Sequence, residues 1–405
     1  MSRHYDIVIV GAGMVGAALA CMLGGSRYRV AVIEAQRPKT RWPKDSVDLR
    51  VSAISAASQQ IFMALDAWER MVALGVSPYY EMHVWDATGN GAIHFDCASV
   101  GEPWLGHIIE NRVIQRALLE RMKAFDNVEL ICPARITTIE DEAEQVCVRL
   151  EGEDAVGAAL VVGADGGNSR VRQQAGIATR GWAYEQKAVV ATVATRKSHQ
   201  ETAWQRFMPD GPLAFLPLRD GRSSIVWSTT PGHADELLAL DDQAFCRALG
   251  EAFEYRLGEI SGTGPRAAFP LRLQHSTRYI APRRALVGDA AHMIHPLAGQ
   301  GVNLGFLDAA ALSEVLLDAL AQDRPFHSQG VLRRYERWRK GDNLLTMSAM
   351  DGFKRLFGSP SLPLRLLRNT GLRLANIESP VKQGLIRQAM GLKGDLPRLA
   401  RWTGI

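Results

Sequence analysis

The amino-acid sequence predicts a mixed α/β fold: a parallel-sheet domain, interleaved with an antiparallel-sheet domain, and a C-terminal helical segment. Two observations lead to this fold class. An apolar strand, a glycine-rich turn and a helix follow one another at the N-terminus and again near residue 288. Between these two units, residues 181–280 contain β-branched and aromatic runs separated by Asp-Gly turn signals. We therefore expect a parallel-sheet domain built from separated segments of the chain.

Composition sets the broad class of protein. The 405 residues are enough for two domains, and 47% hydrophobic with 22% charged residues is ordinary for a globular chain. No apolar run reaches the roughly 18–20 residues of a membrane span, and the N-terminal stretch indicates a folded strand and helix, not a signal peptide. We expect a cytoplasmic protein or one peripheral to the inner membrane. A disulfide framework, a thiol redox pair and a zinc site are disfavoured, because the cysteines are odd in number and scattered: Cys21, Cys97, Cys132, Cys147 and Cys246.

The first glycine-rich turn predicts a Rossmann-like dinucleotide site. The apolar run YDIVIV is followed by Gly11, Gly13 and Gly16, then by a helix and a second strand that ends in Glu34. In this spacing Gly11 allows the tight turn, Gly13 lets a pyrophosphate approach the backbone, and Gly16 lets the helix pack on the strand. The helix N-terminus then faces the phosphates and the carboxylate accepts hydrogen bonds from a ribose. The motif does not by itself distinguish NAD from FAD.

Two later strands end in the same way. Residues 158–163 run into Asp165, and the run RALV leads into Gly288 and Asp289, before a helix that begins near Gly301. Because ligands bind at the carboxyl ends of parallel strands, we expect the three strand ends to lie at one edge of one sheet. One turn then binds the pyrophosphate and the other binds the far end of a long cofactor. A cofactor that spans both turns is FAD.

The motifs resemble those of a known family. The segments GAGMVG, GADGGNSRVR and GDAAHMIHPLAGQGVNLG resemble the three fingerprints of the single-component flavin hydroxylases, which have the para-hydroxybenzoate hydroxylase fold. The segments DLRVSAISAAS, LGHIIENRVIQRAL, HPLAGQGVNLGFLDA and RYERWRKGDN are similar to the ubiquinone-biosynthesis hydroxylases, and the resemblance runs over nearly the whole chain.

The resemblance implies a set of FAD-binding residues. Gly11, Gly13, Gly16 and Glu34 would bind the ADP half, and Arg50 would reach a phosphate or ribose. Asp165 would lie near the pyrophosphate and Asp289 on the ribityl chain or the phosphates. The remaining implied contacts are with the flavin itself: Arg112, Pro296, Gly299, Gly301, Val302 and Asn303. No residue that deprotonates a phenol can be named.

The chemistry that the resemblance implies is ring hydroxylation. NAD(P)H reduces a tightly but non-covalently bound FAD, O2 adds to give a flavin C4a-hydroperoxide, and an electron-rich phenol attacks it. The substrate would be a polyprenylated phenol or benzoquinol of ubiquinone biosynthesis, with ring carbon 6 slightly favoured over carbon 5. The chain has one G-x-G-x-x-G unit, so we expect the nicotinamide to bind transiently.

These expectations divide the chain into three parts. The predicted FAD-binding domain comprises residues 1–75, 100–180 and 281–330. The predicted substrate-binding domain comprises 76–99 and 181–280, and residues 331–405 form the C-terminal helical region, with helices interrupted by Gly and Pro. Four aromatic side chains of the substrate domain either line an apolar cavity for a prenyl chain or simply pack in the sheet core: Trp204, Phe207, Phe215 and Trp227.

The C-terminal region is strongly basic. From residue 331 to the end there are fifteen Lys and Arg against five Asp and Glu, a net charge of +10, so the rest of the chain carries −6 of the total of +4. The segment LPLRLLRNTGLRLANI mixes leucine and arginine at helical spacing. It predicts a helix packed on the body with solvated arginines, a surface that approaches a membrane, or a surface for a protein of a ubiquinone-synthesis complex. We expect no nucleic-acid partner.

Several alternatives stay open. His292 and His295 have a spacing that suits metal ligands on a helix, but no further ligands cluster near them in sequence, so we expect no metal. A flavin halogenase is disfavoured because its W-x-W-x-I-P motif is absent from the sequence. The remaining alternatives are a prenyl-chain reductase, a hydroxylase of soluble aromatic compounds and a non-catalytic flavin- or lipid-binding accessory protein.

Overall fold

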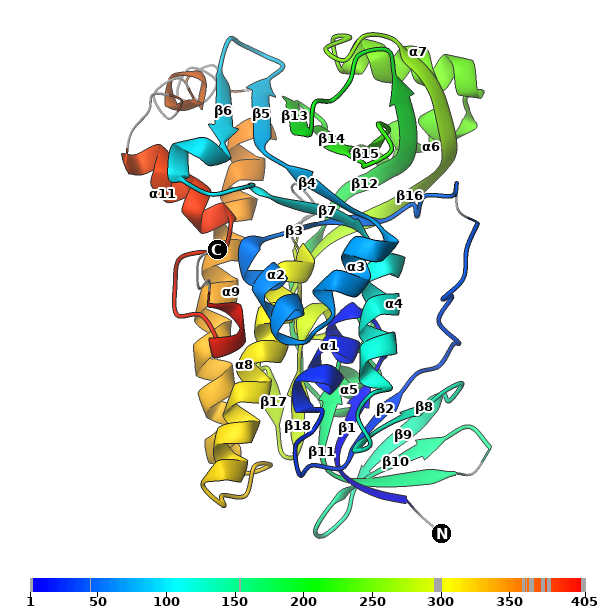
Figure 1. The fold of residues 1–405 in the computed structure, drawn as a ribbon, viewed down its shortest axis with the longest axis vertical. Coiled ribbons are helices and arrows are strands. Elements are labelled where there is room, and N and C mark those ends of the chain that lie inside the picture. The colour runs from blue at the N-terminus through cyan, green and yellow to red at the C-terminus, as the bar shows by residue number, and fades with distance from the viewer. Residues whose placement is uncertain are drawn as a thin grey trace.

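The structure is a computed structural model of the chain. It describes residues 3–43, 45–152, 154–294, 301–358, 361, 363, 368–372, 376 and 380–401. Figure 1 shows an elongated molecule, with one sheet in its lower half and another at its upper end, and with a long helix beside both.

The lower sheet confirms the predicted parallel arrangement. Its strands β18, β11, β1, β2 and β8 are all parallel to their neighbours, and β17 adds an antiparallel edge. A short antiparallel branch, β9 and β10, extends from β11. Since β18, β11 and β1 are adjacent and parallel, their carboxyl ends meet at one edge, as predicted. The strands are β1 (Arg3–Val10), β2 (Val30–Ile33), β8 (Val128–Ile131), β9 (Ile136–Asp141), β10 (Val146–Leu150), β11 (Ala155–Gly163), β17 (Ile280–Ala281) and β18 (Arg284–Leu286).

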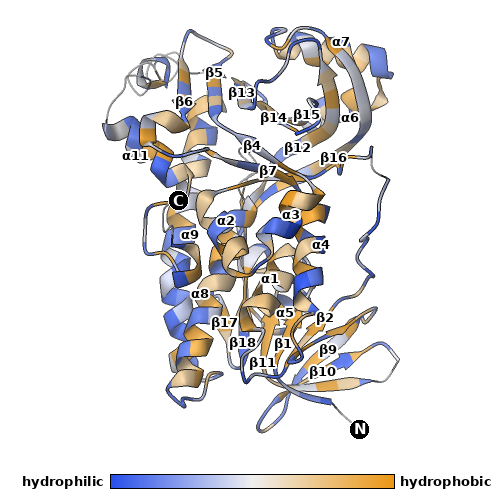
Figure 2. Cartoon of the chain, in the orientation of Figure 1, coloured by the Kyte–Doolittle hydropathy of each residue, from blue (hydrophilic) through white to orange (hydrophobic). Residues whose placement is uncertain are grey.

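Helices cover the parallel sheet, and they also pack against one another. The first helix, α1, is apolar on nearly all sides because it lies between the sheet, α4 and α8. Figure 2 shows hydrophobic residues along the central strands and these inner helices. The helices and short 3-10 turns of this half are α1 (Met14–Leu23), α2 (Ala56–Ala64), α3 (Trp68–Leu74), α4 (Asn111–Met122), α5 (Arg170–Gln174), η2 (Gly288–Ala290) and α8 (Gly301–Ala321).

The second large sheet has the order β19-β16-β12-β15-β14-β13-β5-β6. It is antiparallel as predicted except at one pair, because β5 runs parallel to β13. Helices α6 (Pro231–Ala239) and α7 (Asp242–Ala252) cover one face of it. Its strands are β5 (Glu81–Asp86), β6 (Ala92–Asp96), β12 (Thr179–Thr195), β13 (Thr202–Met208), β14 (Gly211–Pro217), β15 (Ser223–Thr229), β16 (Ile260–Ser276) and β19 (His292–Met293).

A three-stranded sheet stands between the two halves. Strand β7 (Gly106–Glu110) pairs with β3 (Val51–Ile54) on one side and with β4 (Val76–Tyr79) on the other. The 3-10 turn η1 (Cys97–Val100) leads from β6 back toward β7.

The four aromatic residues considered for a prenyl cavity lie on different faces of the second sheet. Phe215 and Trp227 are buried in the core under α6 and α7, where Phe215 stacks on Phe253 with ring centroids 3.9 Å apart. Trp204 packs against the same core and stacks on His83. Phe215, Trp227 and Trp204 are therefore sheet-core aromatics. Phe207 points to the opposite face of the sheet, because side chains alternate between the faces of a strand.

The C-terminal region differs from the interrupted helices that the sequence predicts. Helix α9 (Gln329–Gly358) is one helix of 30 residues that continues through Gly341 and Gly352. Each interior glycine costs about 1 kcal/mol relative to alanine, and the packing of Leu332 and Tyr335 in the core offsets this cost. Two further elements follow, α11 (Pro380–Ala389) and the turn η4 (Arg398–Ala400).

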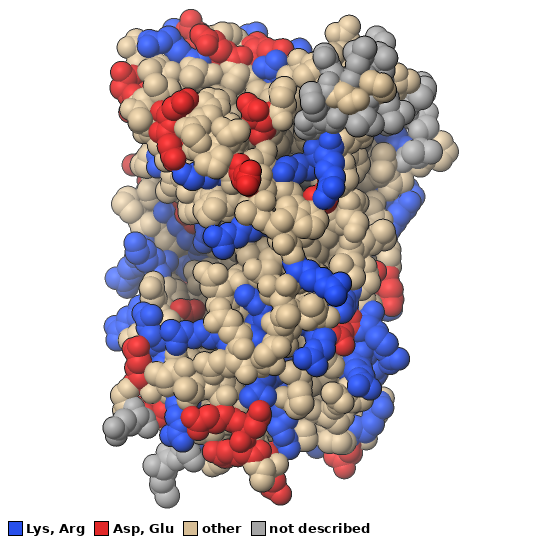
Figure 3. Space-filling view, turned by 180° about the vertical axis from the view of Figure 1, so that it is seen from behind, with Lys and Arg blue, Asp and Glu red and all other residues tan. Residues whose placement is uncertain are grey.

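A buried ion pair attaches the C-terminal region to the second sheet. The Arg368 Nε atom lies 2.6 Å from Asp86 Oδ2, and both side chains are 1% exposed. Figure 3 shows Lys and Arg gathered on the lower right of the rear face, over the half of the molecule that contains α9. Among the residues that the structure describes, no helix is both long and apolar enough to cross a membrane.

Candidate cofactor and substrate site

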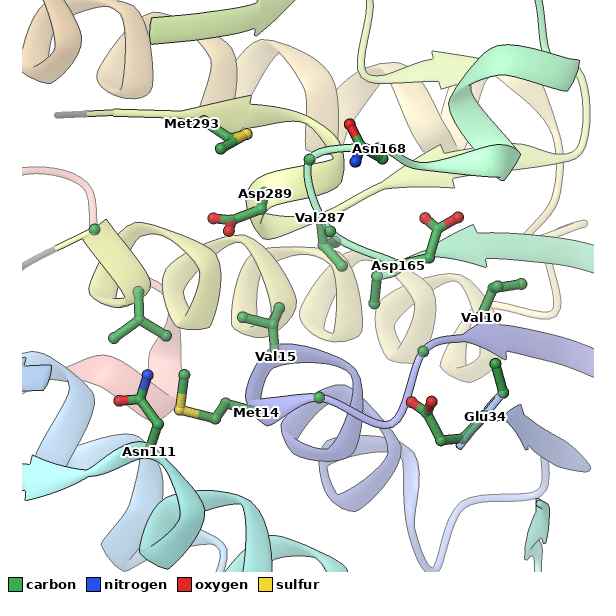
Figure 4. A pocket seen from close by; sticks show the side chains of 18 of the residues that line it. Val10, Met14, Val15, Glu34, Asn111, Asp165, Asn168, Val287, Asp289 and Met293 are labelled. Atoms are coloured by element: carbon green, nitrogen blue, oxygen red, sulfur yellow. The ribbon is translucent and has the colours of Figure 1, made fainter. Parts of the chain in front are cut away.

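A cavity of about 810 Å³ lies where the carboxyl ends of β1, β11 and β18 meet. Figure 4 shows its lining residues, with Glu34 and Asp165 on one side and Asp289 and Met293 toward the other. Residues of both predicted turns line it, including Gly11, Gly13, Glu34, Arg50, Asp165, Asp289, Gly301 and Val302.

The three glycines of the first turn have different surroundings. A Cβ atom on Gly11, whose φ is +103°, would lie 2.5 Å from the Ala164 carbonyl oxygen, and one on Gly16 would lie 2.0 Å from the Gly11 carbonyl oxygen. A Cβ on Gly13 would meet nothing within 4 Å. Gly11 and Gly16 thus allow close backbone packing, whereas Gly13 leaves open space on the cavity side. This is the difference that binding a pyrophosphate at Gly13 requires.

The start of α1 is open to a ligand. Gly13 is the N-cap residue, and no side chain caps the helix. The Glu34 Oε2 atom accepts a hydrogen bond of 2.8 Å from the backbone N–H of Ala12. The carboxylate therefore stands at the mouth of the turn, where it could accept hydrogen bonds from a ribose, while the helix N-terminus favours an anion.

Asp165 has one carboxylate oxygen engaged and one unengaged. Its Oδ2 atom accepts hydrogen bonds from the backbone N–H groups of Arg170, at 2.7 Å, and Val171, at 3.3 Å. Its Oδ1 atom is buried and has no hydrogen-bond partner among the described residues. A buried oxygen of this kind is expected to have a partner, and a cofactor group in the cavity would supply one.

Asp289 and Arg50 place opposite charges on the cavity wall. The side chain of Asp289 faces the open cavity, so its surface is accessible, but the surrounding protein displaces much of its water. This desolvation raises its pKa, and the positive charges of His292 and Arg50 oppose the rise. Arg50 is exposed, and its guanidinium lies 5.9 Å from the centroid of the Phe269 ring. An exposed guanidinium here can reach a phosphate or a ribose.

The second turn is held by a buried charged network, which we name the Asp308 network. The Oδ2 atom of Asp308 lies 2.5 Å from His292 Nε2 and accepts a hydrogen bond of 3.2 Å from the Gly288 N–H. Its Oδ1 atom accepts hydrogen bonds from Arg339 Nε at 3.0 Å and Asn343 Nδ2 at 2.9 Å. Burial raises the pKa of Asp308, but His292 and Arg339 outweigh it, so the net pKa is lowered. The carboxylate joins the turn to α8 and α9.

The other predicted residues of the second turn fall into three groups. Gly301 and Val302 line the cavity. Asn303 is buried: its Oδ1 atom accepts a hydrogen bond from the Ser55 N–H, and its amide donates to the Ala53 carbonyl, so it fixes the start of α8 against β3 and α2. Pro296 and Gly299 lie outside the described residues.

Arg112 is not among the residues that line the cavity. Its guanidinium donates to Glu110 Oε2 at 2.7 Å and to Ser46 Oγ at 3.0 Å, and it lies 4.5 Å from the centroid of the Trp42 ring. The structure thus gives Arg112 contacts that hold the segment around residue 46 against α4. The neighbouring Asn111 lines the cavity instead and accepts a hydrogen bond of 2.7 Å from Ser52 Oγ.

The sequence contains signals for the residues that were not predicted. Asp308 is a charge in the apolar run FLDAAAL, and a charge in such a run indicates a buried pair. Arg339 and Asn343 belong to the segment RYERWRKGDN, which carried the resemblance but was given no structural role. Further lining residues are Met14, Val15, Asn168, Arg170, His292, Met293 and Ile294.

The histidines considered as metal ligands have other surroundings. His292 is bonded to Asp308, and His295 lies outside the described residues. Elsewhere, Glu81, His83 and His94 have ligand atoms within 4.8 Å of one another on β5 and β6. The two imidazole rings are stacked, with centroids 4.1 Å apart. The Nε2 atoms of His83 and His94 both lie near Glu81 Oε2, at 3.5 Å and 3.0 Å.

Comparison with known proteins gives the class. Residues 4–341 match a family model described as FAD binding domain. A probable FAD-dependent monooxygenase of Pseudomonas aeruginosa, PqsL, has a solved structure that is 26% identical, with a TM-score of 0.76 over 92% of this chain and 100% of that one. The p-nitrophenol 4-monooxygenase PnpA of Pseudomonas putida DLL-E4 is 19% identical and shares the fold, with a TM-score of 0.78 over 96% and 97% of the two chains.

Sequence similarity to characterised proteins identifies the family within this class. The chain is 38% identical to the 3-demethoxyubiquinol 3-hydroxylase of Escherichia coli K12, over 96% of this chain and 98% of that protein. It is 37% identical to the ubiquinone hydroxylase UbiL of Rhodospirillum rubrum, over 98% and 92% of the two chains. It is 35% identical to the human mitochondrial ubiquinone biosynthesis monooxygenase COQ6, over 94% and 92%. The chain therefore belongs to the ubiquinone-biosynthesis hydroxylase family of FAD-dependent monooxygenases. This confirms the predicted enzyme class, with FAD as cofactor and NAD(P)H and O2 as co-substrates.

Proposed function

We propose that this enzyme hydroxylates the ring of a polyprenylated phenol or benzoquinol in ubiquinone biosynthesis, with ring carbon 6 favoured over carbon 5. One oxygen atom of O2 enters the ring in place of hydrogen, the other leaves as water, and NAD(P)H supplies the two electrons. The observation that supports this proposal most is the cavity between the two turns, whose lining suits a dinucleotide at one end and an apolar ring at the other.

The cofactor-binding residues follow from the lining. FAD, when bound, supplies the oxygen-transfer chemistry that the sequence predicted. Glu34 would hold the adenosine ribose and the N-terminus of α1 the pyrophosphate, while Arg50 would pair with a phosphate. Asp289 would accept hydrogen bonds from the ribityl hydroxyls. The N-terminus of α8, at Gly301, would direct its free N–H groups at negative charge on the flavin ring.

The substrate ring would lie at the end of the cavity near Met293. Met293, Ile294 and Val302 are apolar, and they would exclude water from the reacting atoms. The face of the second sheet that is turned away from α6 and α7 would form the opposite wall. Val226 belongs to this face and packs in the same apolar cluster as Ile294.

The assignment of chain segments to two domains is part of this proposal. Residues 1–75, 100–180 and 281–330 would form the FAD-binding domain, and residues 76–99 and 181–280 the substrate domain. The basic region from residue 331 onward would rest on an anionic membrane surface or on a protein of the same pathway. The net charge of +10 in that region supports an acidic partner.

The test is product analysis with labelled oxygen. Purified enzyme, NADPH, 18O2 and a short-chain prenylated phenol in detergent are expected to give a product that contains one 18O atom. Fragmentation and NMR of the product then identify the ring carbon. Oxidation of unprenylated aromatic compounds alone would favour a soluble-aromatic hydroxylase. NADPH oxidation that no phenol stimulates would favour an accessory flavoprotein.

A cell-based measurement provides an independent check. Mass spectrometry of the quinone pool in cells that lack the gene should show loss of ubiquinone and accumulation of an intermediate that lacks one ring oxygen. The wild-type gene should restore the pool, and a gene for an enzyme that cannot bind FAD should not. A normal quinone pool in the deletion strain, in the absence of a redundant hydroxylase, would contradict the proposed pathway.

A further inference from the structure

A second cavity, of about 490 Å³, lies between the second sheet and the end of α9. Its volume is within the roughly 300–1,000 Å³ of pockets that take small organic ligands. Three segments form its walls: the middle of β12, the turn from β13 to β14, and the last turns of α9. The lining residues are Trp182, Ala183, Tyr184, Glu185, Gln186, Phe207, Met208, Pro209, Gly211, Pro212, Asp351, Lys354, Arg355 and Phe357.

An irregularity in β12 forms one wall of this cavity. The pairing of β12 with β16 shifts register between Ala183 and Lys187, and the residues between them make no regular pairs with β16. Glu185, within this bulge, has a φ of +52°. A bulge redirects side chains out of the regular alternation and commonly lies next to a functional site. Here it turns Tyr184 toward α9.

Four aromatic side chains line the cavity: Trp182, Tyr184, Phe207 and Phe357. Phe207 stacks on Phe357 of α9, with ring centroids 4.0 Å apart and planes 21° apart. Among the charged lining residues, Asp351 accepts a hydrogen bond of 3.2 Å from the Tyr184 hydroxyl and one of 2.7 Å from Arg355 Nε. The aromatic part of the lining suits an apolar chain.

The mouth of the cavity combines exposed aromatic rings with cations. Trp182, which lines the cavity, is 47% exposed. The Arg355 guanidinium lies 5.4 Å from the centroid of the Trp182 ring, and Lys354 Nζ lies 3.7 Å from the centroid of the Tyr184 ring. Tryptophan with lysine and arginine is the combination that proteins place at the boundary between lipid and water.

A continuous apolar cluster connects this cavity with the cofactor cavity. Tyr184 packs with Leu273 and Met347 in one buried cluster, and Ile294 packs against that cluster. Tyr184 also lines the second cavity, and Ile294 also lines the cofactor cavity. A line of packed apolar side chains therefore connects the walls of the two cavities.

We propose that the second cavity is the subsite for the polyisoprenoid chain of the substrate, entered from the side of Trp182. This inference rests on the proposed function, because it assigns a place to the prenyl chain of that substrate. The ring would lie near Met293 at the cofactor, the first isoprene units would pass beside Met347 and Tyr184, and the chain would continue toward the exposed mouth. Phe207 is the one residue of the four aromatics named from the sequence that lines this path.

The test is a substitution that fills the cavity. Ala183 is exposed and lines the cavity, so Ala183→Trp should fold normally while occupying the path of the chain. We expect kcat/KM for a long-chain prenylated phenol to fall about tenfold or more, which is the effect of a mismatch of one or two methylene groups in an apolar pocket. We expect kcat/KM for the same phenol without its chain to change by less than about twofold.

A matched control and a second readout make the result decisive. Ala92→Trp introduces the same side chain at an exposed position of β6 that does not line the cavity, and it should leave both substrates unaffected. Equal losses for both substrates, or none for either, in Ala183→Trp would overturn the subsite. If wild-type enzyme oxidises no prenylated phenol at all, the proposed function fails instead.

Photolabelling tests the location without a variant. A prenylated phenol with a diazirine near the end of its chain should label peptides that contain residues 182–186, 207–212 or 351–357, and excess unlabelled prenylated phenol should compete. Labelling that detergent or a free isoprenoid alcohol displaces equally well, with no effect on turnover, would assign the cavity to unspecific lipid binding and overturn the proposal.

Discussion

The two glycine-rich turns that border the cofactor cavity are held in place by different means. The first turn is held by backbone contacts within a short stretch, where Gly16 packs on Gly11 and Gly11 packs on Ala164. The second turn is held by the Asp308 network, whose members Asp308 and Arg339 come from α8 and α9. The first turn contains no titratable group of its own, whereas the second depends on a cluster of them.

This difference explains why α9 belongs to the cofactor site although it does not line the cavity. The close contacts of the first turn depend on shape, so they tolerate no added atoms but are insensitive to charge. The second turn depends on compensation between buried charges, so a neutral substitution of the same shape is enough to disturb it. Substitutions that change only the shape or only the charge of a side chain distinguish these two dependencies.

Gly16→Val is expected to have the largest effect. Because even a Cβ atom would lie 2.0 Å from the Gly11 carbonyl oxygen, α1 must move away from β1. We expect a loss of at least about 4 kcal/mol in the free energy of unfolding, most of the stability of an ordinary domain. Thermal unfolding of the apoprotein measures this.

Gly13→Ala is its control, since a Cβ there meets nothing within 4 Å. It should leave the apoprotein Tm unchanged and weaken FAD binding, as measured by flavin fluorescence. A normal Tm for Gly16→Val would show that the first turn is not held by close packing.

Asp308→Asn should come next. It keeps the shape of the side chain but leaves Arg339, which is 2% exposed on its side chain, without its buried partner. Removing one member of a buried pair costs about 3–5 kcal/mol. Chemical denaturation of the apoprotein gives the value.

Asp342→Asn removes the other carboxylate that contacts Arg339, at 3.1 Å, but that carboxylate is 49% exposed. Its loss should therefore cost less than about 1 kcal/mol. Similar values for the two variants would contradict the buried character of the Asp308 network.

The second turn should contribute a pH dependence to stability. Burial, together with the charges of His292 and Lys340, lowers the pKa of His275 from 6.5 to about 4. Between pH 6.5 and 4 the unfolded chain binds a proton at this site that the folded chain does not, so stability is complete above pH 6.5 and falls as the pH decreases toward 4. The loss amounts to about 3 kcal/mol at the lower limit.

His275→Gln should reduce this slope, as measured by denaturation at a series of pH values. His107, whose pKa burial also lowers to about 4, contributes in the same window, so the informative quantity is the difference from wild type. The contribution of Asp308 has the same direction but a lower pH range, because its lowered pKa means that its stabilisation is lost only as the pH falls below the ordinary range of an aspartate. An unchanged slope in His275→Gln would show that the second turn does not titrate.

The sequence predicts the first turn better than the second for the same physical reason. Gly11, Gly13, Gly16 and Glu34 lie in one short stretch, so spacing alone predicts which strand end each one occupies. Asp308 acts on Gly288 from a different element, and no local pattern gives that contact.

The second sheet presents a related difficulty. The alternation of its strands separates two faces, but the sequence does not indicate which face α6 and α7 cover. For that reason Phe215 and Trp227 could not be distinguished from Phe207, which lies on the other face. The bulge in β12 adds a local change of direction that depends on its pairing with β16.

Arg112→Lys should have the smallest effect, and it tests a predicted flavin contact that does not line the cavity. The guanidinium contacts Glu110, Ser46 and the Trp42 ring, and the Glu110 pair is partly exposed, so losing its second hydrogen bond should cost about 1 kcal/mol or less. FAD affinity should then change by less than about fivefold, because 1 kcal/mol corresponds to roughly that factor. Titration of the apoenzyme with FAD, beside Arg50→Lys at the cavity wall, measures both. A larger loss for Arg112→Lys than for Arg50→Lys would mean that the segment around Ser46 moves when FAD binds and that Arg112 then reaches the flavin. In that case a charged side chain on α4 would also help to bind the cofactor. The two sides of the cavity would then differ less in their dependence on charge.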